Sequence, residues 1–184
     1  MRWFWIDRFV EFVSGTRAEA VKAVTLAEEE LDNYIPGFPV MPASLIVEGF
    51  AQTGGLLVGE TRDFHHRTVL AKVGKSKFHV EALPGDTLHY KVTIQDLADD
   101  GAIVHCTATI DGNLQAEAEL FFAHLDDRFP GVDLFYPADF LAILRLLGVY
   151  DVGCHADGTP LDVPPYLLEA EERENREGKW AVRV

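Results

Sequence analysis

Hydrophobic and polar residues follow two different patterns in the first half of this chain. Residues 18–26 alternate apolar and polar positions with the two-residue period of a β-strand, and residues 9–13 are also strand-like. Ser14-Gly15-Thr16 separates the two segments, so we expect an N-terminal hairpin. Residues 42–59, in contrast, are apolar on nearly every side, which is typical of an enclosed helix.

The expected helix is preceded by a segment rich in proline and glycine. Residues 36–59 have the sequence PGFPVMPASLIVEGFAQTGGLLVG. Pro42 suits the first turn of a helix, where its missing N–H would have no partner. The apolar run is too short and too rich in glycine to cross a bilayer, so we predict no membrane association. Gly54 and Gly55 indicate a close backbone approach, either to a twin helix or to an acyl chain lying alongside.

The strand pattern returns after the helix. Residues 69–80, 87–97, 103–110 and 114–123 are expected to form an antiparallel run, with the first of them interrupted near Gly74. A hairpin, one buried helix and an antiparallel run are satisfied by a single sheet wrapped around a single helix. The predicted class is therefore α+β.

The last third of the chain has a different composition. We expect a short helix at residues 140–147, ended by Gly148, then a proline-rich loop at 157–165 and a charged helix at 169–179. No chemical motif is apparent there. The predicted organisation is one domain at 1–125 and an extension at 126–184 that packs on the domain or on a neighbouring subunit.

Charge and cysteine content exclude several classes of protein. The formal net charge of −14 disfavours nucleic-acid binding. Cys106 and Cys154 are too few for a disulfide framework, and no spacing of Cys and His predicts a metal site. We expect no cofactor, a reducing cytoplasmic location and no N-terminal targeting segment.

Glu48 is the strongest candidate for chemistry. It is one acid inside the apolar run, with Gln52 one helical turn later. An ionised carboxylate in such surroundings needs a partner, water or a chemical role, because its desolvation costs several kcal/mol. The alternative is a structural acid that pairs with Gln52 or with water in a dimer interface. We expect a dimer, because one sheet of this size covers only one side of the helix.

The central segment resembles that of the hot-dog-fold 3-hydroxyacyl-ACP dehydratases of fatty-acid synthesis. That family carries the pattern H-F-P-G-x-P-V-M-P-G-x-L-x-x-E-A-x-A-Q. The matching positions here are Pro36-Gly37, residues 39–42, Leu45, Glu48 and Ala51-Gln52. The resemblance covers roughly the first two-thirds of the chain. It implies a hot-dog fold, an antiparallel sheet around one long helix, with the site completed across a two-fold axis.

The resemblance also implies roles for individual residues. Glu48 would act on the leaving hydroxyl from the other subunit, and the Ala43 amide would hold the thioester carbonyl oxygen. Tyr34 stands where the family has its catalytic His. The substrate would be an acyl-ACP or acyl-CoA thioester. Four residues would bind the substrate: Pro42, Gln52, Phe38 and Met41.

A tyrosine at the base position leaves three interpretations open. A phenol with a pKa near ~10 accepts a carbon-bound proton poorly at neutral pH. The chain is then a dehydratase with altered chemistry, a non-catalytic acyl- or carrier-binding protein that supports a second hot-dog subunit, or an acyl thioesterase in which Glu48 activates water. His65 or His66 would serve as a substitute base if their loop folded in, although loop histidines are usually solvent-exposed. His89 and His105 are predicted to face outward.

A basic stretch offers a surface for an acidic carrier protein. Residues 62–80 contain five basic residues and one acid, a net charge of +4 in a chain that is acidic as a whole. Ordinary surface charge is the alternative. The predicted carrier-binding residues are Arg67, Lys72, Lys75 and Lys77.

Overall fold

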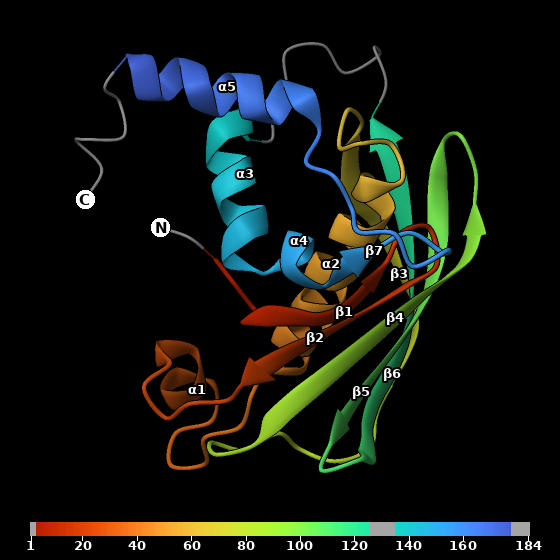
Figure 1. The fold of residues 1–184 in the computed structure, drawn as a ribbon. Helices are drawn as coiled ribbons and strands as arrows, with labels where there is room; N and C mark the ends of the chain where they lie inside the picture. The colour runs from red at the N-terminus through yellow and green to blue at the C-terminus, as the bar shows by residue number, and fades with distance from the viewer. Residues whose placement is uncertain (1–2, 126–134, 178–184) are drawn as a thin grey trace.

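The computed structural model describes residues 3–125 and 135–177, in which one sheet is the main element (Figure 1). The strand order is β3-β6-β5-β4-β2-β1-β7. All neighbouring strands are antiparallel except β1 and β7, which are parallel. The strands are β1 (Arg8–Val13), β2 (Arg17–Ala23), β3 (Arg67–Phe78), β4 (Thr87–Leu97), β5 (Gly101–Ile110), β6 (Asn113–Leu125) and β7 (Gly153–Cys154).

The predicted N-terminal hairpin is confirmed. Gly15 in the turn has a φ of 65°, which a residue without a Cβ adopts freely, and Phe12 pairs with Ala18 beside it. The chain then leaves the sheet for α1 (Glu29–Tyr34) and α2 (Ala43–Glu60), and returns as β3 at the far edge. Three consecutive acids, Glu28 to Glu30, lie at the start of α1.

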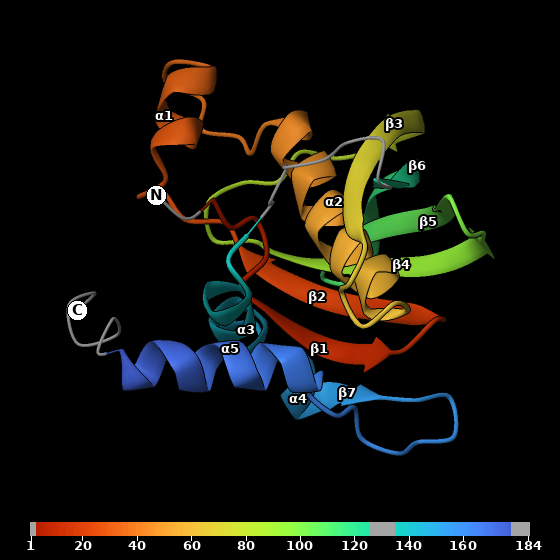
Figure 2. The ribbon, with the colours of Figure 1, turned by 90° about the horizontal axis from the view of Figure 1, so that it is seen from above.

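Helix α2 lies along one face of the sheet (Figures 1 and 2). Its fully buried side chains include Phe50 and Leu57. The rings of Phe50 and Tyr90 of β4 pack edge to face, with their centroids 5.3 Å apart. This confirms the predicted sheet around one helix. Pro42 is the N-cap and not part of the first turn, so the helix begins one residue later than expected.

Glycines set the distance between α2 and the sheet. A Cβ at Gly49 would lie 2.5 Å from the ring of Tyr90, and one at Gly54 would lie 3.0 Å from the ring of Phe122. A side chain at either position would therefore displace the ring that faces it. The close approach expected at Gly54 is therefore to the sheet, and the interpretation as contact with a twin helix or an acyl chain was wrong for this residue.

Strand β3 forms one edge of the sheet and pairs with β6 alone. The interruption expected near Gly74 is a register shift between Val73 and Ser76 within a continuous strand. A Cβ at Gly74 would lie 3.0 Å from the backbone oxygen of Glu119, so glycine allows the two strands to approach at the shift.

The C-terminal part adds three helices and a short strand. They are α3 (Pro137–Leu146), α4 (Val149–Val152) and α5 (Pro165–Arg176), with β7 between the last two. Gly148, at a φ of 73°, follows α3 as expected. The Phe9 amide donates to the Leu147 carbonyl at 2.8 Å, and β7 continues this pairing along β1. A domain boundary after residue 125 stays a prediction.

Within the described ranges, no helix combines the length and the hydropathy needed to cross a membrane.

Candidate functional site

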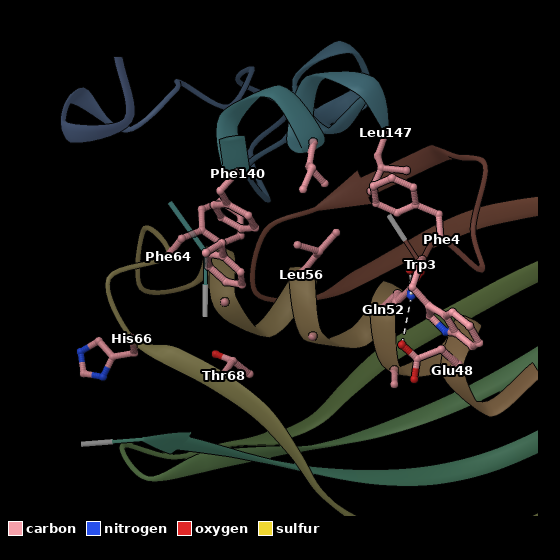
Figure 3. Close-up of a pocket in the computed structure, with 15 residues that line it drawn as sticks. Trp3, Phe4, Glu48, Gln52, Leu56, Phe64, His66, Thr68, Phe140 and Leu147 are labelled. Carbon is pink, nitrogen blue, oxygen red and sulfur yellow. Dashed lines mark hydrogen bonds between the residues drawn. The ribbon is translucent and has the colours of Figure 1, made fainter. Parts of the chain in front are cut away.

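A cavity of about 360 Å³ separates α2 from α3 (Figure 3). Such a volume lies at the lower end of the range of about 300–1,000 Å³ that small-molecule sites occupy. Apolar side chains make up most of the lining, and polar groups lie at its two ends. The lining includes Phe4, Ala51, Leu56, Phe64, Phe140, Ile143 and Leu147.

Glu48 lies at one end of this cavity and is half-buried. The Gln52 amide nitrogen donates to Glu48 Oε1 at 3.0 Å and to the Trp3 carbonyl at 2.9 Å. In return, the Trp5 amide donates to Gln52 Oε1 at 2.8 Å. Gln52 therefore fixes one oxygen of the acid and also ties the N-terminal segment to α2. The Glu48–Gln52 pair was expected, whereas the part played by the N-terminal segment was not.

The opposite end carries Thr68 and His66. Thr68 Oγ1 lies 3.1 Å from Nδ1 of His124, a buried residue of β6 that the sequence analysis missed. Burial, followed by the neighbouring His66 and Arg62, lowers the pKa of His124 below its usual value. A lowered pKa favours the neutral ring of His124, and in the tautomer that leaves Nδ1 unprotonated this atom accepts a hydrogen bond from the Thr68 hydroxyl.

The two loop histidines have different surroundings. His66 lines the cavity and its ring centroid lies 5.6 Å from that of His124. His65 instead stacks on Tyr166 of α5, with centroids 4.4 Å apart. Both side chains are exposed. Of the two candidates for a substitute base, the structure brings only His66 to the cavity.

The start of α2 lies outside the cavity lining. Ala43 is the first residue of the helix, where an amide N–H has no intrahelical acceptor, and Pro42 supplies no side-chain cap. Five residues separate Ala43 from Glu48, a rise of about 7.5 Å. Met41 is buried, and Phe38 is 47% exposed.

The side chain of Tyr34 lies outside what the structure describes. Helix α1 ends at this residue. Its part in the site, like those of Pro42, Ala43, Met41 and Phe38, stays a prediction.

The basic stretch is less positive than its sequence suggests. Lys77 pairs in register with Glu117 of β6, and Lys75 and Lys77 share a surface depression with Glu117 and Glu119. His79 Nε2 also lies 3.0 Å from Glu117 Oε1. The charge count along the chain missed these acids because they follow about forty residues later.

Two further basic residues belong to this stretch. The Lys72 ammonium lies 5.0 Å from the ring centroid of Phe121. Arg67 begins β3. His89 and His105 are exposed, as predicted.

The fold and the acid within its central helix define a hot-dog protein of the dehydratase class. A family model described as the FabA-like domain matches residues 3–119. The chain belongs to this family.

Its relatives include the 3-hydroxyacyl-[acyl-carrier-protein] dehydratase FabZ of Oenococcus oeni. The two are 42% identical over 118 residues, which is 64% of this chain and 85% of the relative. The FabZ of Ligilactobacillus salivarius is 36% identical and is covered to 84%. The resemblance to the dehydratase family is thus confirmed. The family match ends at residue 119, so the extension at 126–184 lies outside it.

Solved structures show the same fold at low sequence identity. One is the dehydratase heterocomplex ApeI:P from Xenorhabdus doucetiae, with a TM-score of 0.57, 13% identity and coverage of 68% of this chain and 85% of that one. Another is a Streptococcus mutans protein bound to acetyl CoA, with a TM-score of 0.55, 20% identity and coverage of 68% and 93%.

Proposed function

We propose that this protein acts on 3-hydroxyacyl thioesters, carried on acyl carrier protein or CoA, as a dehydratase-type lyase. The observation that carries the proposal is the position of Glu48, a half-buried acid held by Gln52 at the end of an apolar cavity. Two relatives, from Oenococcus oeni and Ligilactobacillus salivarius, are dehydratases of this kind. Acyl thioesters are therefore the substrate class that we assign.

The reaction requires three groups around the thioester. A base removes a proton from the carbon next to the carbonyl, and the electron pair forms the new double bond as the hydroxyl leaves. Glu48 donates a proton to this hydroxyl, which leaves as water. The amide of Ala43 donates to the carbonyl oxygen, where negative charge develops, and the N-terminus of α2 favours that charge. Pro42, Met41 and Phe38 would contact the substrate at the helix start, and Gln52 would contact it beside Glu48.

Tyr34 occupies the base position in this proposal. A positioned base contributes typically ~10²–10⁴-fold to the rate, and a phenol is mostly neutral at pH 7. We therefore expect slow dehydration by this chain alone. A second hot-dog subunit that keeps the His would complete the site, which is the second candidate function.

The proposed assembly is a homodimer, a multiple of it or a pair with such a subunit. Support comes from β3, a twelve-residue strand at the sheet edge whose side chains are exposed or half-buried throughout. Leu70, Val73 and Phe78 are each more than a third exposed. These apolar side chains alternate with basic ones along β3, and its unpaired backbone groups are a template on which the edge strand of another subunit can add. A cytoplasmic location is part of the proposal.

The test follows dehydration and thioester hydrolysis of 3-hydroxyacyl-ACP and 3-hydroxyacyl-CoA by purified protein. We expect Tyr34→His to raise the dehydration rate ~10²-fold or more. Glu48→Gln should abolish this gain, because an amide keeps the shape of the acid without its proton. Glu60→Gln is the matched control, since Glu60 ends the same helix but does not line the cavity.

Three outcomes would overturn different parts of the proposal. Wild-type dehydration with a turnover of ordinary size, ~10 s⁻¹, would contradict the expected slow rate and would mean that another base such as His66 acts. The absence of any gain in Tyr34→His would favour the non-catalytic binding protein. Hydrolysis that depends on Glu48, without dehydration, would identify a thioesterase.

A further inference from the structure

One wall of the cavity beside α2 comes from residues outside the part of the chain that the family model matches. Its floor is α2, within the matched residues 3–119, and its roof is α3, which begins at Pro137. Phe140 and Leu147 point into it from the roof side, and Ile143 also lines it. The chain's own C-terminal extension therefore forms one wall of this partly open space.

The cavity is elongated along α2 (Figure 3). Glu48 lies at one end and Gly59 near the other, and eleven residues of helix rise by about 16 Å. Phe64 and Phe140 meet edge to face at the far end, with centroids 5.1 Å apart, and Phe140 is stacked on Phe135 at 4.1 Å. Because Phe140 is held on both sides, it forms a firm end wall.

The floor of the cavity is unusually open. Ala51, Gly55 and Gly59 line it at intervals of one helical turn. A Cβ at Gly55 would lie 3.4 Å from Phe122, which is an ordinary contact, so packing does not require glycine there. Glycine within a helix costs about 1 kcal/mol relative to alanine. Its presence at this position leaves space in the cavity for a ligand.

We propose that this cavity binds the acyl chain of the thioester within a single subunit, and that Ile143 and Phe140 of the extension determine the chain length it accepts. The inference rests on the proposed function for the identity of the ligand. An apolar cavity with an acid at one end suits an unbranched chain of medium length, whose reacting carbons stay at Glu48. Leu56 and Ile143 are among the apolar residues that line it.

The test measures binding of butanoyl, octanoyl and dodecanoyl pantetheine thioesters to the full-length protein by calorimetry. These thioesters separate binding of the chain from recognition of any carrier. Each methylene that enters the cavity should tighten binding by about fourfold. The ratio of dodecanoyl to butanoyl affinity is the readout.

Two variants should reduce this ratio from opposite walls. Ile143→Trp fills the cavity from α3, and Gly55→Val fills it from α2, so we expect each to lower the ratio at least tenfold. Leu146→Trp is the matched control, because Leu146 is 59% exposed and does not line the cavity, and it should keep the wild-type ratio. Thermal unfolding of each variant verifies that it is folded.

The possible results separate this inference from the proposed function. A ratio that does not change in folded Ile143→Trp and Gly55→Val overturns the inference, even if the protein dehydrates 3-hydroxybutanoyl thioesters. Failure to bind any of the three thioesters also overturns it. Length-dependent binding that both variants reduce supports it, even if no dehydration is found and the proposed reaction fails.

Discussion

Lys22 of β2 is a buried cation, and its removal should have a large and measurable effect on stability. Its side chain is 7% exposed, and its ammonium pairs with Glu28 and lies 3.5 Å from Asp7 Oδ1. It also donates to the Ala23 carbonyl at 2.8 Å and lies 5.9 Å from the ring centroid of Trp5. Glu28 is the residue that precedes α1, so this pair connects α1 to the sheet.

The expected cost follows from the burial of both partners. Lys22→Met keeps most of the apolar stem but leaves the Glu28 carboxylate without its cation. Loss of one partner from a buried pair costs about 3–5 kcal/mol. The Glu28 side chain is 19% exposed and regains some water, so we place the loss near the lower limit, about 3 kcal/mol.

Urea unfolding of a double-mutant cycle tests this value. The cycle combines Lys22→Met with Glu28→Gln, and we expect a coupling free energy of about 2 kcal/mol. Arg17→Met is the control, because the Arg17–Glu11 pair is exposed (39% and 36%) and such pairs contribute about 1 kcal/mol or less. If Lys22→Met cost no more than the control, or if the two changes were additive, the reasoning from burial would be refuted.

Three further predictions concern pH, assembly and carrier binding. Burial raises the pKa of Glu60, so its contribution to stability is present below its unfolded pKa and is lost as pH rises through the folded one. Glu60→Gln should therefore raise the urea midpoint at neutral pH and have no effect below pH ~4, and an effect equal at both pH values would contradict this. Light scattering should give a multiple of 20.5 kDa, and a monomer at micromolar concentration would argue against the proposed dimer. Reversal of Lys72, Lys75 and Lys77 to Glu should weaken binding to an acidic carrier protein and remove its salt dependence, whereas unchanged affinity would favour a CoA ester.

Local sequence determined much of the fold. β4 was predicted with its observed limits because a Pro84-Gly85-Asp86 turn precedes it and an acidic, glycine-containing turn follows it. The central helix was evident from an apolar run that no strand of ordinary length contains. The acid at Glu48 was conspicuous for the same reason, since a charged residue in such a run requires an explanation.

The features that were missed depend on contacts between distant parts of the chain. Thr68 and His124 are 56 positions apart and meet only because β3 pairs with β6. Gln52 reaches the N-terminal segment across 47 positions. Neither contact leaves a periodic pattern in the sequence. The aromatic run at residues 3–5 was the one available indication that the N-terminus packs against something.

The roof of the cavity was missed for a different reason. The apolar positions of α3 were recognised, but an amphipathic helix indicates only that one face is covered. Which element lies opposite, and whether space remains between them, depends on how the sheet, α2 and α3 are placed together.

The pairing of β7 with β1 has a consequence for how copies of this sheet can associate. The carbonyls of Leu147 and Cys154 accept hydrogen bonds from the Phe9 and Ser14 amides, and β7 pairs with β1. The extension therefore satisfies backbone groups along the outer side of β1. Among the described strands, β3 is then the edge on which another strand can add. If strands can add at one edge only, two copies of the sheet associate through that edge about a two-fold axis, and the resulting dimer is closed. In the proposed dimer, the extension would therefore stop further addition of strands beside β1, and the pair formed through β3 could not extend into a fibre.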